Sequence, residues 1–137
     1  MNINLYSLGL MSGTSLDGID VSIIKSDGEQ YLEIIDDLYL KYNDQLKLKL
    51  KKIIDSCTSK DQLVKRSKEI NKLEKELTLC HANAYKLITE KNKNIKIDLI
   101  GFHGQTILHK PKKGYSIQIG DSKLLSKITN TTIISNF

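Results

Sequence analysis

One short stretch, GLMSGTSLDGID at residues 9–20, gathers residue types that bind anions: three glycines, three hydroxyl side chains and two carboxylates. Strand-like apolar segments flank it at residues 5–11 and 19–24, so we expect a β-hairpin with the polar residues in its loop. Successive backbone amides in a tight loop can converge on an anion, and Gly13 and Gly18 carry no side chain that would block its approach. The stretch therefore predicts a loop that holds phosphate groups.

The carboxylate of Asp17 would repel a phosphate in this loop, because two like unit charges about 4 Å apart repel by roughly 4 kcal/mol at an effective dielectric of about 20. A divalent cation between the two groups reverses the sign of that interaction. Mg²⁺ is a hard ion that carboxylates and substrate phosphates commonly share, and Asp20 is close enough in sequence to bind the same ion. The loop therefore predicts a Mg²⁺ site at Asp17 and Asp20.

A plain turn is the alternative interpretation, because Ser, Thr, Asp and Gly are also the residues that tight turns use. Asp17 and Gly18 alone would make a two-residue turn, with the glycine at positive φ. The small polar run begins earlier, at Ser12, and this extra length favours a binding loop. The spacing matches neither a P-loop ending in Gly-Lys-Ser/Thr nor the glycine pattern of dinucleotide-binding folds.

A second polar group, His103-Gly104-Gln105-Thr106, follows a predicted buried strand at residues 99–102. Open α/β sheets bind ligands beyond the carboxyl ends of their strands, so we expect this group to form a loop beside a binding site. Its flexible backbone and neutral donors suit sugar hydroxyls. The histidines lack the paired helical spacing of a zinc site, and His81 is expected on a helix surface or in packing.

The segments around these motifs predict an α/β domain with a mixed sheet. A third strand at residues 31–40 completes an antiparallel meander with the hairpin. A helix at 43–57 precedes a longer one, capped by Ser59 or Asp61, whose buried stripe is Ile70, Leu73, Leu77, Cys80, Ala84 and Leu87. The remaining elements are a strand at 115–120, a helix from Asp121 or Ser122 to Thr129, and a strand at 132–135. No linker or repeat divides residues 1–137, so we expect one domain.

The composition, 39% hydrophobic and 27% charged, is ordinary for a globular protein. A net charge of +5 makes a small basic nucleic-acid-binding protein one hypothesis. We disfavour it, because the lysines alternate with acidic residues, Arg66 is the single arginine, and the lysine-rich helices lack aromatics for base stacking. The apolar runs are far shorter than the roughly 20 residues that cross a bilayer, and the N-terminus lacks the basic region of a secretory signal. These features predict a cytoplasmic protein that binds neither nucleic acid nor membrane.

Three segments together resemble the anhydro-N-acetylmuramic acid kinase family, within the sugar kinase, Hsp70 and actin superfamily. They are GLMSGTSLDGIDVSI, IGFHGQTILHKP and SIQIGDSKLLSKITNTTIISNF, in the family's order. The resemblance implies the N-terminal lobe of the actin-like ATPase, or ribonuclease H-like, fold. It also implies a cytoplasmic enzyme of cell-wall recycling. Such enzymes use ATP and water to open 1,6-anhydro-N-acetylmuramic acid and phosphorylate it, giving N-acetylmuramic acid 6-phosphate and ADP.

The same resemblance implies site residues. The family binds ATP phosphates on the hairpin between its first two strands, a role that falls here to Gly13, Thr14, Ser15, Leu16, Asp17, Gly18, Ile19 and Asp20. His103, Gln105 and Thr106 match the second motif and are implied to line the sugar cleft. ATP, Mg²⁺ and an anhydro-amino-sugar are therefore the expected ligands.

Family members continue beyond the segment that matches Phe137, into a catalytic aspartate and a second lobe. We therefore expect residues 1–137 to be the N-terminal lobe of a truncated or split kinase, with no catalytic residue of its own and inactive alone. The alternative is a non-enzymatic fragment that folds by pairing with a separately encoded C-terminal part, and a homodimer also stays open. Asn130 and Asn136 stand where the family usually has glycine and aspartate, so the local turns are in question.

Overall fold

The structure is a computed structural model that describes residues 3–137. Its strands are β1 (Leu5–Ser12), β2 (Gly18–Ser26), β3 (Leu32–Lys41), β4 (Leu99–Phe102), β5 (Gln105–Lys110), β6 (Tyr115–Ile119) and β7 (Thr132–Ile134). Its helices are α1 (Asp44–Ser56), α2 (Lys60–Lys65), α3 (Ser67–Lys91) and α4 (Ser122–Thr129), with a 3₁₀ turn at Pro111–Lys113. None of the helices in this range is long and apolar enough to span a membrane.

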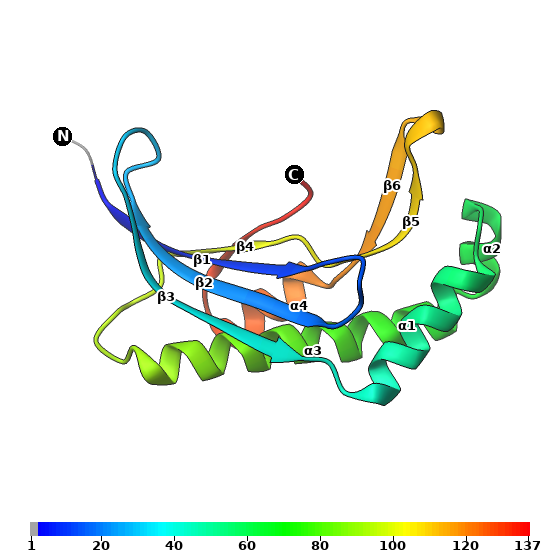
Figure 1. The fold of residues 1–137 in the computed structure, drawn as a ribbon, viewed down its shortest axis with the longest axis horizontal. Helices are drawn as coiled ribbons and strands as arrows, with labels where there is room; N and C mark the ends of the chain where they lie inside the picture. The colour runs from blue at the N-terminus through cyan, green and yellow to red at the C-terminus, as the bar shows by residue number, and fades with distance from the viewer. Residues whose placement is uncertain (1–2) are drawn as a thin grey trace.

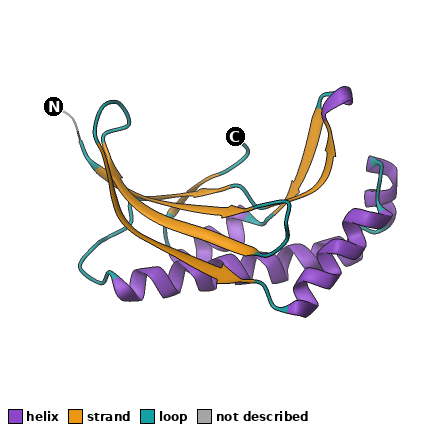
Figure 2. Ribbon diagram, in the orientation of Figure 1, coloured by secondary structure: helices purple, strands orange, loops and turns teal. Residues whose placement is uncertain are grey.

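Five strands form the main sheet, in the order β3-β2-β1-β4-β7. β1, β2 and β3 pair antiparallel as the predicted meander, whereas β4 pairs parallel with both β1 and β7. The predicted mixed α/β sheet is therefore confirmed. β5 and β6 form a separate antiparallel hairpin that projects beyond one end of the main sheet (Figure 1). α1, α3 and α4 lie on one side of the main sheet, and no helix of residues 3–137 covers its other face (Figure 2).

The core lies between the main sheet and the long helix α3. Most of the predicted α3 stripe is confirmed as buried. The prediction that Leu87 is buried is wrong, because this residue is 37% exposed and its neighbour Ile88 is fully buried instead. Helical geometry explains the difference. Ile70 and Ile88 are separated by about five full turns of 3.6 residues, so Ile88, and not Leu87, lies on the same face as Ile70. Cys80 is only partly buried, whereas its neighbour His81 is fully buried within the stripe, which confirms a packing role for this histidine.

The helices begin at capped residues, as the sequence predicts. The side chains of Asn43, Ser59 and Asp121 each accept a hydrogen bond from a backbone amide in the first turn of α1, α2 and α4. The single long helix expected from Ser59 is wrong, because Arg66 departs from helical geometry and separates α2 from α3. The guanidinium of Arg66 donates to Glu69 on α3 and to Ser56 at the end of α1, so it connects α1 with α3 beside this break.

The loop expected at residues 103–106 is shorter than predicted. Gln105 already begins β5, and its backbone pairs with Ile119 on β6. The change of direction is made at Gly104, which has a φ of +76° and lies so close to Ile119 that a β-carbon would collide with its carbonyl oxygen. Only glycine fits this position, so the bend takes fewer residues than the polar sequence suggests.

The turn of the first hairpin also differs from the prediction. Leu16, and not Gly18, has the positive φ, at 59°. Its side chain is 7% exposed, and this burial offsets the backbone strain. Gly18 instead begins β2 against β3, where a β-carbon would collide with the Leu40 carbonyl oxygen and lie 2.9 Å from Lys41 Cα. Gly18 is therefore required by strand packing.

The register of β4 against β1 is held at its start by a reciprocal pair. The amide of Asp98 donates to the Tyr6 carbonyl at 2.9 Å, and the amide of Tyr6 donates to the Asp98 carboxylate at 2.8 Å. The two residues are 92 positions apart, and the parallel pairs that follow, such as Ser7 with Leu99, keep this offset.

Both asparagines that depart from the family pattern lie at left-handed positions. Asn130 ends α4 with a φ of 49°, and Asn136 has a φ of 61°. Asparagine tolerates this region better than other residues with side chains, so Asn130 can end the helix as a glycine would.

We predict that Gly18→Ala lowers the free energy of unfolding by about 2–3 kcal/mol, because the added methyl group displaces the β3 backbone. Urea denaturation measures the change. Gly9→Ala on β1 is the matched control, since a β-carbon at Gly9 meets no atom within 4 Å. Equal losses in the two variants would contradict the proposed crowding at Gly18.

Candidate functional site

The loop at residues 13–17 joins β1 to β2 and is open to solvent at its tip. Thr14 and Ser15 are exposed, and no described residue accepts a hydrogen bond from their backbone amides. The Leu16 amide donates to the Gly13 carbonyl at 3.4 Å, which closes the loop with a long bond. A β-carbon at Gly13 would meet only Ser15 Oγ, at 4.0 Å, so the approach to these amides is unobstructed.

A buried histidine lies beneath the start of this loop. His81 Nδ1 is 2.9 Å from the Leu77 carbonyl and must donate to it, because a carbonyl only accepts. Ser12 Oγ donates to the Gly104 carbonyl at 2.8 Å and lies 3.4 Å from His81 Nε2. Burial lowers the pKa of His81 to about 4, so the ring is neutral at pH 7. Ser12 thereby links the end of β1 to the bend after β4.

A second buried link comes from Gln105. Its Nε2 donates to the Gly13 carbonyl at 3.1 Å, and its Oε1 accepts from the Tyr42 hydroxyl at 3.3 Å. Gln105 is fully buried, and Tyr42 is 2% exposed, with burial raising the pKa of its hydroxyl. The structure thus directs the Gln105 side chain at the hairpin loop, while its predicted contact with a sugar stays a prediction.

The two carboxylates predicted to bind Mg²⁺ have different surroundings. Asp17 pairs with Lys47 of α1 at 2.7 Å, and this hydrogen-bonded lysine, assisted by Ser15, holds the pKa of Asp17 below its usual range. Asp20 is exposed and lies on the face of the sheet that lacks helices. No group of three or more His, Cys, Asp or Glu side chains with metal-binding geometry occurs among residues 3–137. The Mg²⁺ assignment to Asp17 and Asp20 therefore stays a prediction.

His103 lies between two hollows at the carboxyl end of β4. One, of about 310 Å³, is also lined by Asp20, so the structure brings these two predicted site residues together. The other, of about 110 Å³, is lined in addition by Gln118 and Ser122. Thr106 is near this group, since its Oγ1 accepts from Gln118 Nε2 at 3.3 Å.

Sequence reasoning missed Gln118 and Ser122. Both lie where β6 ends and α4 begins, and the rule that ligands gather at the carboxyl ends of strands would have indicated them. The segment has the pattern of an ordinary strand followed by a helix cap, which carries no signal of binding.

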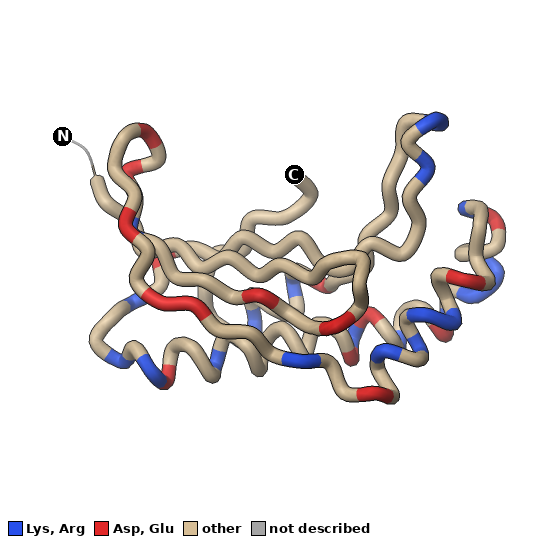
Figure 3. Tube along the Cα trace, viewed as in Figure 1, with Lys and Arg blue, Asp and Glu red and all other residues tan. Residues whose placement is uncertain are grey.

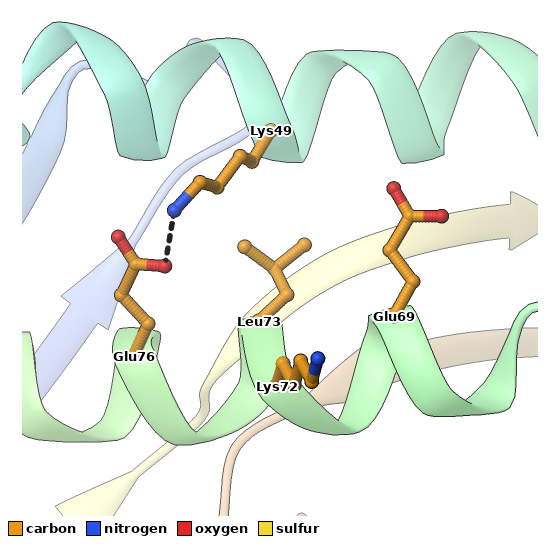
Figure 4. A pocket seen from close by; sticks show the side chains of 5 residues that line it. All are labelled: Lys49, Glu69, Lys72, Leu73 and Glu76. Carbon is orange, nitrogen blue, oxygen red and sulfur yellow. Dashed lines mark hydrogen bonds and ion pairs between the residues drawn. The ribbon is translucent and has the colours of Figure 1, made fainter.

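A third hollow, of about 200 Å³, lies between α1 and α3, where Lys49 reaches across to Glu76 at 2.8 Å (Figure 4). Leu73 points into the gap between the two helices. None of the predicted site residues lines it, and two of its charged side chains, Lys49 and Glu76, pair with each other, so it is not part of the candidate site.

Comparison with known proteins identifies the family. A family model described as anhydro-N-acetylmuramic acid kinase matches residues 5–137. The chain belongs to this kinase family. Curated anhydro-N-acetylmuramic acid kinases from Pelagibacter ubique, Gluconobacter oxydans and Rhizobium etli are 46%, 38% and 37% identical to it over 131, 133 and 136 residues.

The matches cover 96–98% of this chain but only 35–37% of the three kinases. The chain therefore spans little more than a third of the length of these relatives. Membership in the anhydro-N-acetylmuramic acid kinase family confirms the predicted superfamily, that of the sugar kinases and actin-like ATPases. The loop at residues 13–17 and the bend at Gly104 both lie within the matched region.

We predict that Gln105→Leu lowers the free energy of unfolding by about 1–3 kcal/mol, because it leaves the Tyr42 hydroxyl and the Gly13 carbonyl without a buried partner. It should also speed amide hydrogen exchange at residues 13–17, which mass spectrometry can measure. Gln118→Leu, at an exposed position on β6, is the matched control. Unchanged exchange in the Gln105 variant would show that this side chain does not hold the loop.

We predict that His81 makes the folded state sensitive to acid. Burial lowers its pKa to about 4 in the folded chain, from about 6.5 for an exposed histidine. Between about pH 7.5 and pH 5 the unfolded chain binds a proton that the folded chain does not, so the free energy of unfolding falls by about 2 kcal/mol. Urea denaturation at several pH values measures this fall. His81→Gln should abolish this fall of about 2 kcal/mol in the free energy of unfolding. His109→Gln, which replaces an exposed histidine, should retain the fall.

Proposed function

We propose that this chain supplies the ATP-binding part of an anhydro-N-acetylmuramic acid kinase. The loop of Gly13, Thr14, Ser15, Leu16 and Asp17, together with Gly18, Ile19 and Asp20 at the start of β2, holds the ATP phosphates. The observation that carries this proposal is the pair of free amides at Thr14 and Ser15, beside a Gly13 that leaves their approach open. Amides arranged in this way form a site for an anion, and the family match supports ATP as its source.

Mg²⁺ fits the carboxylates of this region, because it prefers oxygen ligands and binds through one or two carboxylates together with phosphates. Asp20 is exposed beside the loop and can bind the ion directly. The Oδ1 atom of Asp17 pairs with Lys47 at 2.7 Å, so Asp17 would join the ion through Oδ2 or by releasing Lys47. A released Lys47 would be free to face a phosphate. The ion would supply the positive charge that offsets the phosphates.

The sugar is proposed to bind beside His103 and Thr106. Donors and acceptors from Gln118 and Ser122 lie around the same end of β4, and they suit a ligand rich in hydroxyls. Gln105, between His103 and Thr106 in sequence, instead supports the neighbouring phosphate loop, because its side chain donates to the Gly13 carbonyl. The reaction would consume ATP and water, open the 1,6-anhydro ring and release ADP, as part of cell-wall recycling in the cytoplasm.

Phosphoryl transfer needs a base and an acceptor held in line with the phosphate, in addition to a phosphate-binding loop. We propose that residues 1–137 form one lobe that binds ATP, and that the part of the family's length outside the match supplies the catalytic aspartate. ADP release from ATP and anhydro-sugar is therefore not expected with this chain alone. Turnover by the purified chain would contradict this assignment.

We predict that the chain binds ATP in the presence of Mg²⁺ and that Gly13→Val weakens binding about tenfold or more, equivalent to about 1.4 kcal/mol or more. The valine side chain would fill the approach to the amides. It should leave the fold intact, because Gly13 has no positive φ and open space around it. Isothermal titration calorimetry measures the affinity.

Gly9→Ala, on the preceding strand, is the control variant, and circular dichroism checks that both variants are folded. Undetectable ATP binding by the unaltered chain, or equal binding by the Gly13 variant, would contradict the proposed nucleotide site.

A further inference from the structure

Tyr42 is a buried polar side chain outside the predicted site. It lies between Lys41, the last residue of β3, and Asn43, the residue that caps α1, and it is 2% exposed. Its amide donates to the Asp17 carbonyl at 2.9 Å, and its hydroxyl donates to Gln105 Oε1 at 3.3 Å. Tyr42 therefore contacts one end of the hairpin loop directly and reaches the other end through Gln105.

The hydrogen bonds of the Gln105 amide determine which way this side chain is turned. The Gly13 carbonyl only accepts, so Gln105 Nε2 must face it, and Oε1 then faces Tyr42. Burial raises the pKa of the Tyr42 hydroxyl, so this group keeps its proton and donates it to Oε1. Without the hydroxyl, Oε1 would lose this donor in a buried position, where an unpaired oxygen is costly. The Tyr42 hydroxyl therefore holds Gln105 in the orientation that reaches Gly13.

The bond to the Gly13 carbonyl also sets the direction of the Thr14 amide. The two groups belong to one planar peptide unit, and because its bond is trans, the carbonyl and the N–H point in opposite directions. Gln105 holds the carbonyl toward the buried side, so the Thr14 N–H is turned toward solvent. At the other end of the loop, the Tyr42 amide fixes the next peptide plane by its bond to the Asp17 carbonyl.

This path of hydrogen bonds is made of neutral groups. The segment 99–109, which runs from β4 into β5 and contains Gln105, has no Lys, Arg, Asp or Glu and is tan in Figure 3. Charge beside the loop comes instead from Asp17 and Lys47, which pair with each other. A neutral path does not attract a phosphate by its own charge, so its contribution is the direction in which it holds the loop amides.

We propose that Tyr42 is a positioning residue of the phosphate site, which orients the Thr14 amide through Gln105 and holds the far end of the loop by its own amide. This inference rests on the proposed function, because it requires the loop to bind phosphates. α1 fixes the position of Tyr42, since the Asn43 side chain accepts from the Leu46 amide at 2.7 Å and Leu46 is 1% exposed. The junction of β3 and α1 is therefore part of the support of the site.

Packing alone is the alternative role of a buried tyrosine, and Tyr42→Phe separates the two. Phenylalanine keeps the ring in the core and removes only the hydroxyl that orients Gln105. A packing role predicts unchanged ligand affinity in this variant. A positioning role predicts weaker binding by a chain that is still folded.

The experiment measures, by isothermal titration calorimetry in the presence of Mg²⁺, the affinity of the full chain for ATP and for inorganic triphosphate. We expect Tyr42→Phe to weaken both about three- to tenfold, the effect of losing one net hydrogen bond. Tyr85→Phe is the matched control, because Tyr85 also packs against the core but lines a different hollow, with Thr129 and Asn130. Circular dichroism checks that both variants are folded.

A double-mutant cycle with Gln105→Leu tests the route of the effect. If the hydroxyl acts through Gln105, Tyr42→Phe should cause little further loss of triphosphate affinity once Gln105 has been replaced. Independent losses that multiply in the double variant would show that Tyr42 acts by another route and would overturn the proposal.

The two ligands separate this inference from the proposed function. Equal binding by Tyr42→Phe and the unaltered chain overturns the positioning role and leaves the nucleotide site standing, as does an equal loss in Tyr85→Phe. Binding of triphosphate but not ATP by the unaltered chain contradicts the nucleotide assignment alone. Binding of neither ligand contradicts both.

Discussion

Two hydrogen bonds from buried side chains support the loop on which the candidate site depends. They run from Ser12 to the Gly104 carbonyl and from Gln105 to the Gly13 carbonyl. The loop's own closing bond, from the Leu16 amide, is 3.4 Å long and therefore weak. The bend after β4 thus acts as the support of the hairpin loop. The neutral His81 ring of α3 packs beside Ser12, with Nε2 3.4 Å from its Oγ, so a helix far from the loop in sequence contacts the same support.

Local sequence patterns predicted most of the strands and helices, because alternation and capping depend on residues that are close together in the chain. Alternation identified the meander, and the caps at Asn43, Ser59 and Asp121 marked helix starts correctly. Two of the misses depend on distant partners. Gly18 is glycine because β3 passes beside it, and Gln105 belongs to a strand because β6 pairs with it. Composition could not reveal either neighbour.

The site was predictable in its residue types and less so in its arrangement. Spacing and resemblance indicated the hairpin and the segment after β4, and the structure places Asp20 and His103 around one hollow. Sequence could not show that Lys47 pairs with Asp17, since the lysine comes from a helix 30 residues further along the chain. Nor could it show that one sheet face stays bare, because the exposed residues of β3 alternate there like those of an ordinary solvated strand.

The constant offset of 92 residues extends beyond the paired strands. It relates Tyr6 to Asp98, Ser12 to Gly104 and Gly13 to Gln105. Insertions and deletions in the intervening turns and helices change the value of this offset but keep it equal for all three pairs, provided that β4 still reaches β1. A single residue inserted between Asp98 and Gly104 would make the offsets unequal. Either the pair of Tyr6 with Asp98 or the hydrogen bonds that reach the hairpin loop would then be lost. Evolution can therefore vary the middle of the chain in length, while the two short segments that meet at the loop must keep their spacing.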